Sequence, residues 1–350
     1  MNDAGEWPLK RLMTEVVGSG TKSAEDMTRE QATEAMTRIL DGEPDPTTLG
    51  AFWLANRWKR NTPTELAAFV DVIDEHVERA VPDVDPVDCG ANYDGKARTA
   101  VLGVAAGVVA AAAGTPVVVH SGDRIPTQKA DAYKHVLDEL GARTELRPNE
   151  SAAMVEETGF GFYYQPEFTP AIDALFDRRD MMGVRTFVNT VETLANPASA
   201  SVHLGSFYHL SFAKKVIQTL ERSHTRDPDR VIMFQGLEGY DDVRPGYTKI
   251  AEWTPQDGLT ANEIETSTYG MDFEDEELEV ANVAEDSAQL TREVLAGERT
   301  NHWVDAVALN AAIRIYAGGD ADSLNDGLEA ARKVIDDGSA AAVLEDVRGF

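Results

Sequence analysis

The sequence of 350 residues has little cysteine and little positive charge. Cys89 is the only cysteine, so an internal disulfide is excluded. Lys and Arg number 32 against 61 Asp and Glu, which gives a formal net charge of -29. Nucleic-acid binding needs clustered cations that neutralise phosphates, so this charge disfavours it, although a local basic groove stays open. An acidic surface of this kind is stable where salt screens its self-repulsion, and a halophilic source is our hypothesis.

Signals for secretion or for a membrane span are also lacking. No positively charged segment followed by an apolar run opens the chain, and we therefore expect a cytoplasmic location. The longest apolar stretch, residues 100–120, is broken by three glycines and by Thr115-Pro116. This pattern predicts a buried helix, a turn and a strand, and it excludes the membrane as a partner.

The sequence also lacks the usual signatures of zinc sites and of serine hydrolases. Its seven histidines show no short paired spacing, which argues against zinc. A nucleophile elbow, the strained strand-to-helix turn that presents a catalytic serine, has no supporting motif.

Helix start signals dominate the first eighty residues. Residues 28–31 (TREQ) and 62–65 (TPTE) are capping boxes, and Asp45-Pro46 begins a further helix between them. Apolar residues follow each signal at helical spacing. We therefore expect residues 1–80 to form a small helical domain.

Residues 81–350 alternate strand-like apolar runs with helical segments. This alternation predicts a larger α/β domain with a mostly parallel sheet flanked by helices. Ligands in such sheets bind at the carboxyl ends of the strands. The acidic segment 252–286 is interpreted as a solvated β-excursion or loop. The clearest strand candidates are residues 117–120, 143–146, 160–164 and 231–234.

Three stretches, in the same order, match a known family. The first is residues 40–66 and the last is residues 309–340. The middle stretch has two segments, Gly183-Val184-Arg185-Thr186-Phe187-Val188-Asn189 and Leu194-Ala195-Asn196-Pro197-Ala198. Together they resemble the anthranilate phosphoribosyltransferase family, which has the glycosyltransferase family 3 fold. The resemblance implies a discontinuous helical domain, in which residues 166–205 return to residues 1–80, and a homodimer formed through that domain.

The resemblance also implies an activity. Enzymes of this family transfer a ribosyl phosphate from a pyrophosphate donor, phosphoribosyl pyrophosphate, to a small aromatic or heterocyclic acceptor. Backbone amides, cations and a divalent metal must then stabilise the departing pyrophosphate. We therefore expect a Mg²⁺-dependent phosphoribosyl or related glycosyl transferase.

The donor site falls on three loops. Residues 90–99 stand where the family has a Gly-Thr-Gly-Gly-Asp-Gly loop, but they lack its interior glycines, so an altered phosphate loop and an ordinary turn both stay open. His120-Ser121-Gly122-Asp123-Arg124 corresponds to the family's Lys-His-Gly-Asn-Arg, and Lys129 to a family lysine. A lone histidine at a strand end is more often structural than catalytic. The candidate donor contacts are Gly90, Asn92, Asp94, Gly95, Lys96, Arg98, Thr99, His120, Arg124 and Lys129.

Acceptor and metal residues are implied in the same way. Arg179 occupies the position of the family's acceptor-binding arginine, and a guanidinium suits a carboxylate because it donates two parallel hydrogen bonds. Asp241 and Asp242 follow the strand candidate 231–234 and resemble the family's Gly-Leu-Asp-Glu metal motif. They would hold Mg²⁺ as hard oxygen ligands.

A second hypothesis is a catalytically inactive relative. One branch of the superfamily has lost the glycine-rich loop and binds nucleic acid along a basic groove of its dimer, and residues 93–98 and Thr127 look closer to that branch. The basic stretches Arg57-Trp58-Lys59-Arg60 and Lys214-Lys215 would form such a groove. The net charge and the Asp241-Asp242 pair argue against it.

Overall fold

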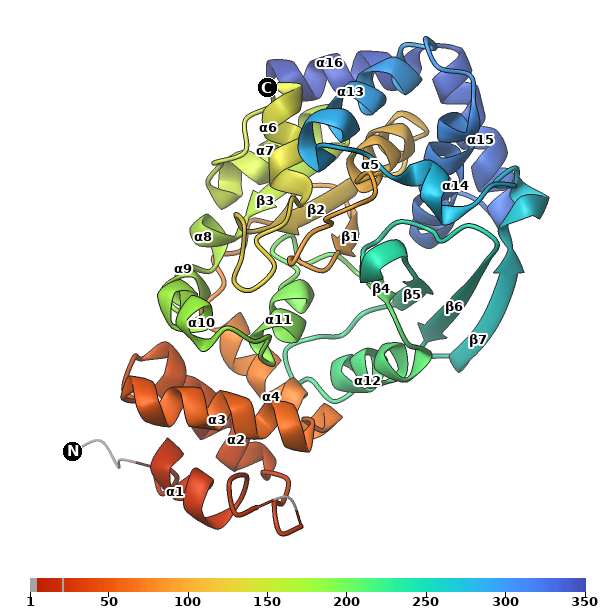
Figure 1. Ribbon diagram of the computed structural model, residues 1–350. Helices are drawn as coiled ribbons and strands as arrows, with labels where there is room; N and C mark the ends of the chain where they lie inside the picture. The colour runs from red at the N-terminus through yellow and green to blue at the C-terminus, as the bar shows by residue number, and fades with distance from the viewer. Residues whose placement is uncertain (1–4, 21) are drawn as a thin grey trace.

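The computed structural model describes residues 5–20 and 22–350, and it has a helical part beside a larger α/β part (Figure 1). α2 (Arg29–Leu40) and α4 (Pro63–Asp74) each begin at a complete capping box, and the Asp45 carboxylate caps α3 (Pro46–Lys59). The three helix starts predicted from the sequence are therefore confirmed. α1 (Leu9–Glu15) also belongs to this part, and the short helices α8 (Gln165–Phe168), α9 (Pro170–Asp173), α10 (Phe176–Met182) and α11 (Val188–Val191) come from the middle of the chain.

Side chains from the middle of the sequence complete the core of the helical part. Ile172, Leu175, Phe187 and Val191 are buried in one cluster with apolar residues of α1 to α4. Phe187 stacks on Phe69 of α4, with ring centroids 4.3 Å apart. The boundary at residue 80 and the return of residues 166–205 stay predictions.

A seven-stranded sheet forms the centre of the α/β part, in the order β3-β2-β1-β4-β5-β6-β7. β1 to β5 are parallel, and β6 and β7 add an antiparallel hairpin at one edge. This confirms the mostly parallel sheet. The strands are β1 (Val87–Gly90), β2 (Val117–Ser121), β3 (Phe160–Tyr164), β4 (Val202–Phe207), β5 (Arg230–Gln235), β6 (Tyr247–Thr254) and β7 (Gly258–Glu265).

One predicted strand is wrong. Residues 143–146 have no strand partner and connect α6 (Tyr133–Leu140) to α7 (Pro148–Thr158). Thr144 and Leu146 are buried while Arg143 and Glu145 are exposed, which reproduces the two-residue period of a strand without a neighbour to pair with. The acidic segment includes the last residues of β6 and the whole of β7, and the short 3₁₀ helices η3 (Thr266–Tyr269) and η4 (Asp275–Leu278) follow β7.

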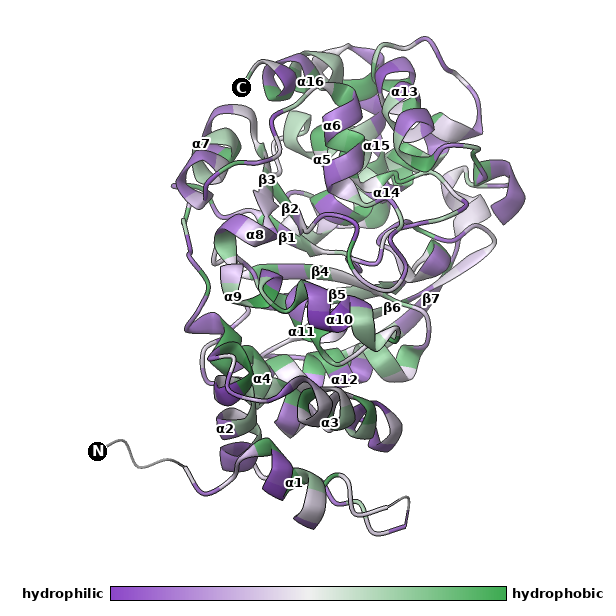
Figure 2. Cartoon of the chain, turned by 60° about the vertical axis from the view of Figure 1, so that its left-hand side comes forward, coloured by the Kyte–Doolittle hydropathy of each residue, from purple (hydrophilic) through white to green (hydrophobic). Residues whose placement is uncertain are grey.

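Helices cover both faces of the sheet. On one face, α5 (Gly103–Ala112) is almost wholly buried, and with β2 it turns the apolar stretch 100–120 into the expected helix, turn and strand. Figure 2 shows hydrophobic residues gathered around α5 and the strands. No helix within residues 5–20 and 22–350 is both long and apolar enough to cross a membrane. Further helices of this face are α6, α13 (Val283–Leu295), α14 (His302–Gly318), α15 (Leu324–Asp336) and α16 (Ser339–Gly349).

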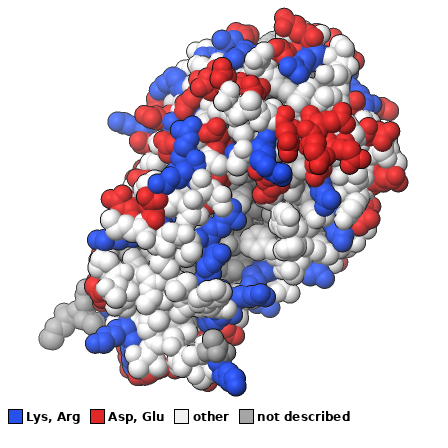
Figure 3. Space-filling model, in the orientation of Figure 1, with Lys and Arg blue, Asp and Glu red and all other residues white. Residues whose placement is uncertain are grey.

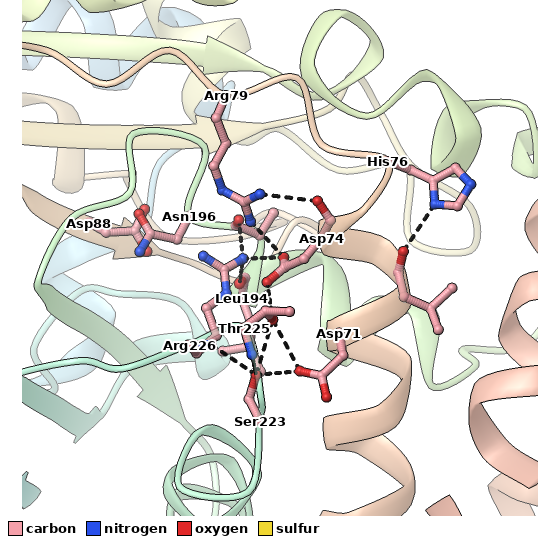
Figure 4. Close-up of polar contacts among 12 residues, drawn as sticks. Asp71, Asp74, His76, Arg79, Asp88, Leu194, Asn196, Ser223, Thr225 and Arg226 are labelled. Carbon is pink, nitrogen blue, oxygen red and sulfur yellow. Dashed lines mark hydrogen bonds and ion pairs between the residues drawn. The ribbon is translucent and has the colours of Figure 1, made fainter. Parts of the chain in front are cut away.

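On the opposite face, α12 (Leu210–Leu220) shares its core with the helical part, and a buried arginine joins the two parts. Arg226, in the loop after α12, pairs with Asp74 at the end of α4 at 2.5 Å. The same nitrogen donates to the carbonyls of Leu194 and Ala195 (Figure 4). Arg79 also pairs with Asp74, at 2.9 Å. A buried carboxylate is stable only when paired, so this cluster fixes α4 to the loop after α12 and to the segment that contains Leu194.

Candidate functional site

A cleft lies between the helical part and the carboxyl ends of β1 and β4, with a volume of about 360 Å³. Basic side chains border the hollow on the face drawn in Figure 3, although the protein as a whole is acidic. The cleft brings together segments that are far apart in the sequence. The helical side of the cleft is lined by Arg57 of α3 and by Arg185 and Asn189, which lie before and in α11. The sheet side is lined by residues at or after the strands and at the start of α12: Gly90, Asn92, Asp94, His203, Tyr208, His209, Phe212, Glu238 and Gly239.

Three of the ten predicted donor contacts line this cleft: Gly90, Asn92 and Asp94. A β-carbon at Gly90 would lie 2.2 Å from the carbonyl oxygen of Thr193, so only glycine fits there. Asp94 pairs with Arg185, with 2.8 Å between Nε and Oδ2, and it accepts a hydrogen bond from Asn189. Burial raises the pKa of Asp94 to about 6, and Arg185 opposes this shift.

The rest of the 90–99 loop folds back onto the protein. Gly95 has a φ of 76°, a conformation that favours glycine, and the amide of Lys96 donates to the carbonyl of Asp131. The amides of Ala97 and Thr99 both donate to the Glu238 carboxylate, at 3.1 and 2.9 Å. Burial alone would raise the pKa of Glu238, but these donors hold it below its usual value. The Glu238 carboxylate therefore accepts hydrogen bonds from two amides that would otherwise be free to bind an external anion.

The predicted metal carboxylates are enclosed and paired. Asp241 and Asp242 are fully buried; Asp242 lies 2.6 Å from Nζ of Lys96, and Asp241 lies 2.6 Å from Nη2 of Arg314. Tyr133 also donates its hydroxyl to Asp241. Burial raises the pKa of Asp241 to about 6 against the opposing charge of Arg314. Within residues 5–20 and 22–350, no cluster of three or more Asp, Glu, His or Cys side chains could hold a metal ion.

The predicted acceptor arginine is paired in the same manner. Arg179 in α10 donates through both Nη atoms to the Glu192 carboxylate, at 2.7 and 2.8 Å. Glu192 begins the 3₁₀ helix η1 (Glu192–Leu194), is buried, and also accepts from the Gln165 side chain at 3.1 Å. Arg179 therefore does not line the cleft, and its guanidinium already holds a carboxylate.

The remaining predicted contacts lie outside the cleft. Lys129 pairs with Asp180 of α10 at 2.9 Å, and Arg124 pairs with Asp131 at 2.7 Å. Arg98 is exposed and is 3.5 Å from Glu279. Thr99 donates its amide to Glu238. His120 is fully buried, and its surroundings are described next.

A buried carboxylate joins two histidines beneath the cleft. Asp88 in β1 accepts from Nδ1 of His203 at 2.8 Å, and its other oxygen lies 3.1 Å from Nε2 of His120. Tyr93 contacts Nδ1 of His120. Burial alone would raise the pKa of Asp88, but the two imidazoles outweigh it and hold that pKa below its usual value. Asp88 and His203 were not predicted from the sequence; their only signal was a charged residue and a histidine inside otherwise buried strands.

The fold and this cleft are those of a two-part α/β transferase with a helical bundle. Two family models match the chain: "Glycosyl transferase family, helical bundle domain" over residues 13–77 and "Glycosyl transferase family, a/b domain" over residues 84–341. The chain therefore belongs to this glycosyl transferase family.

Curated relatives narrow the comparison. The anthranilate phosphoribosyltransferase of Natronomonas pharaonis is 31% identical over 331 residues, which cover 93% of this chain and 96% of the relative. The one from Methanocorpusculum labreanum is 32% identical over 330 residues, with 93% and 94% covered.

Solved structures agree on the fold. Anthranilate phosphoribosyltransferase from Thermus thermophilus superimposes with a TM-score of 0.81 at 27% identity, over 98% of each chain. The Saccharomyces cerevisiae enzyme, in complex with PRPP and Mg, gives a TM-score of 0.82 at 17% identity over 98% of each chain. At that identity the yeast structure supports the fold alone.

Proposed function

We propose that this chain is a Mg²⁺-dependent phosphoribosyltransferase that transfers a ribosyl phosphate from phosphoribosyl pyrophosphate to a small aromatic or heterocyclic acceptor. The observation that carries the proposal is the cleft at the carboxyl ends of β1 and β4, bordered by Gly90, Asn92 and Asp94. This is where parallel α/β sheets bind ligands, and the relatives in the preceding subsection are phosphoribosyltransferases.

The metal is proposed to enter with the donor. As they stand, Asp241 and Asp242 do not fit a resident ion, because both are fully buried and each already accepts from a cation. Direct coordination by this pair stays a prediction, and it requires Lys96 to release Asp242. Mg²⁺ keeps several waters and binds readily to phosphate oxygens, so a pyrophosphate can carry it into the cleft.

The acceptor side of the cleft is aromatic. Tyr208 and Phe212 are 64% and 36% exposed, and both line the cleft beside His209. Flat side chains of this kind favour a ring-shaped ligand. Because Arg179 already holds Glu192, we propose an acceptor that does not depend on its own carboxylate for binding.

Calorimetry tests this function directly. Phosphoribosyl pyrophosphate is titrated into the protein with and without Mg²⁺, in a buffer of high salt. We expect saturable binding that requires Mg²⁺. Absence of any heat in both titrations would refute the proposal.

The nucleic-acid alternative is not favoured. Three of the basic side chains proposed for a groove are engaged within the chain: Lys59 pairs with Asp26 and Glu65, Lys215 donates to the carbonyl of Asn61, and Arg57 donates to the carbonyl of Arg185. A salt-dependent gel shift with single-stranded DNA would support nucleic-acid binding after all.

Three further properties belong to the proposal. Leu54, Trp58 and Met181 are exposed apolar side chains on α3 and α10, and they would form a homodimer contact through the helical part. A cytoplasmic location stays a prediction. The halophilic hypothesis rests on the net charge of -29, and it fails if the protein is most stable at low ionic strength.

A further inference from the structure

His203 and Asp88 form a dyad across two neighbouring strands. The two residues are direct partners in the β1–β4 register, so their side chains project from the same face of the sheet. Nδ1 of His203 lies 2.8 Å from Oδ2 of Asp88, which is fully buried. The imidazole is 6% exposed and reaches the wall of the cleft. The buried Asp88 carboxylate therefore holds His203, and the edge of the imidazole opposite Asp88 faces the cleft.

Two glycines leave room for that far edge. A β-carbon at Gly90 would lie 2.6 Å from Cε1 of His203, and one at Gly205 would lie 3.1 Å from Nε2. Gly90 ends β1 and lines the cleft, and Gly205 is its partner inside β4, so a side chain at either position would crowd the ring. In the part of the chain that the structure describes, Nε2 has no hydrogen-bond partner. The ring is therefore kept accessible on the side that faces away from Asp88.

Asp88 determines which ring nitrogen carries the proton. A carboxylate accepts from Nδ1–H, so the neutral imidazole has its lone pair on Nε2. The low pKa of Asp88 keeps this carboxylate ionised. An imidazolium that forms at His203 is stabilised by the negative charge beside it, as it is in other histidine–carboxylate pairs.

We propose that His203 is the general base of the transfer and that Asp88 is its positioning residue. This inference rests on the proposed function. The acceptor nitrogen forms a bond to C1 of the ribosyl group, while the bond from C1 to the pyrophosphate oxygen breaks and its electron pair leaves with the pyrophosphate. The proton of the acceptor N–H passes to Nε2 of His203. Asp88 keeps its charge throughout.

Other titratable groups face the same space. Asp94 and Glu238 line the cleft with Arg57, Arg185 and His209, and the pKa of Asp94 lies near 6. On the other side of the ring, Arg79 and Arg226 border a smaller hollow that His203 also lines. His120 shares the Asp88 carboxylate. A pH profile of the parent protein alone therefore does not identify the base, and variants are needed.

Steady-state kinetics from pH 5 to 9 separate these groups. His203→Gln is expected to lower kcat by about 100- to 10,000-fold and to remove the acid limb of the profile. Asp88→Asn is expected to lower kcat less and to move that limb. The exposed His224→Gln serves as the matched control, and it should behave as the parent does. Retention of kcat and of the acid limb in His203→Gln would overturn the proposal.

Two measurements distinguish a failure of this proposal from a failure of the proposed function or of folding. Calorimetry with phosphoribosyl pyrophosphate and Mg²⁺ should give His203→Gln the affinity of the parent; loss of donor binding in the parent would refute the phosphoribosyltransferase function instead. Nitrogen-15 shifts of the histidines in the unaltered protein should show His203 as the Nδ1–H tautomer. The Nε2–H tautomer would overturn the dyad even if both variants failed to fold.

Discussion

Glu192 holds Arg179 through both terminal nitrogens of the guanidinium, at 2.7 and 2.8 Å, in a buried pair next to the cleft. The arginine that the sequence predicts for a carboxylate-bearing acceptor thus meets a carboxylate of its own chain. Two analogous pairs occur nearby, because Glu238 occupies the amides of Ala97 and Thr99 and Asp242 occupies Lys96. Internal carboxylates satisfy much of the positive potential of the site.

Glu192→Gln should release Arg179 for external carboxylates. The change keeps the shape of the side chain but removes its charge, and we expect tighter binding of anthranilate than in the parent, measured by calorimetry. It should also lower the free energy of unfolding by about 3–5 kcal/mol, because it leaves a buried cation uncompensated. The exposed Glu157→Gln is the control. Equal anthranilate affinity in parent and Glu192→Gln would contradict this role of the pair.

Lys96→Met should make the Asp241–Asp242 pair sensitive to Mg²⁺. Removal of one partner of a buried pair costs about 3–5 kcal/mol, so Tm should fall without metal. Since Asp242 then lacks its cation, Mg²⁺ should recover part of that loss. Thermal unfolding with and without MgCl₂ measures both effects, and the exposed Lys333→Met is the matched control. If Mg²⁺ leaves the Tm of Lys96→Met unchanged, these carboxylates cannot take up the metal.

Asp94 should destabilise the fold as pH rises. Its folded pKa, about 6, lies above the usual value of 3.8, so the folded state binds the proton more tightly than the unfolded state. Its favourable contribution is fully present below pH 3.8 and is lost as pH rises toward 6. In Asp94→Asn this part of the pH dependence should vanish, as measured by urea unfolding at several pH values between 4 and 7. Identical slopes in variant and parent would show that Asp94 has an ordinary pKa.

Trp58→Glu should weaken the proposed dimer. Trp58 is 75% exposed on α3, and a charge in an apolar contact opposes its burial. Light scattering after size-exclusion chromatography should show a dimer for the parent and more monomer for the variant. Tyr247→Glu, at an aromatic residue that is 43% exposed on β6, is the control. A parent protein that runs as a monomer would refute the dimer.

Local signals in the sequence were enough to predict much of the fold. The capping boxes at Thr28 and Thr62 fix helix starts through residues three positions apart, and β2, β3 and β5 are continuous apolar runs. β1 and β4 were missed because β1 has only four residues and because each strand carries a polar side chain, Asp88 or His203, inside it. An alternating pattern at residues 143–146 imitated a strand that has no partner.

The site was harder to predict, because its interactions join distant parts of the chain. The sequence predicts seven ligand contacts within residues 90–99, and three of them, Gly90, Asn92 and Asp94, line the cleft. It does not reveal that Asp242 reaches Lys96 across 146 positions, or that Asp88 reaches His203 across 115. Such pairing depends on the order of the parallel strands, which a motif at one position does not encode.

Release of pyrophosphate is the most direct test of the central claim. The protein is incubated in high salt with phosphoribosyl pyrophosphate, Mg²⁺ and a panel of small aromatic and heterocyclic acceptors, with anthranilate among them. We predict that pyrophosphate appears in step with a ribosylated acceptor, that it requires both Mg²⁺ and the acceptor, and that acceptors without a carboxylate are used. Binding of the donor with no acceptor-dependent pyrophosphate from any member of the panel would contradict the account.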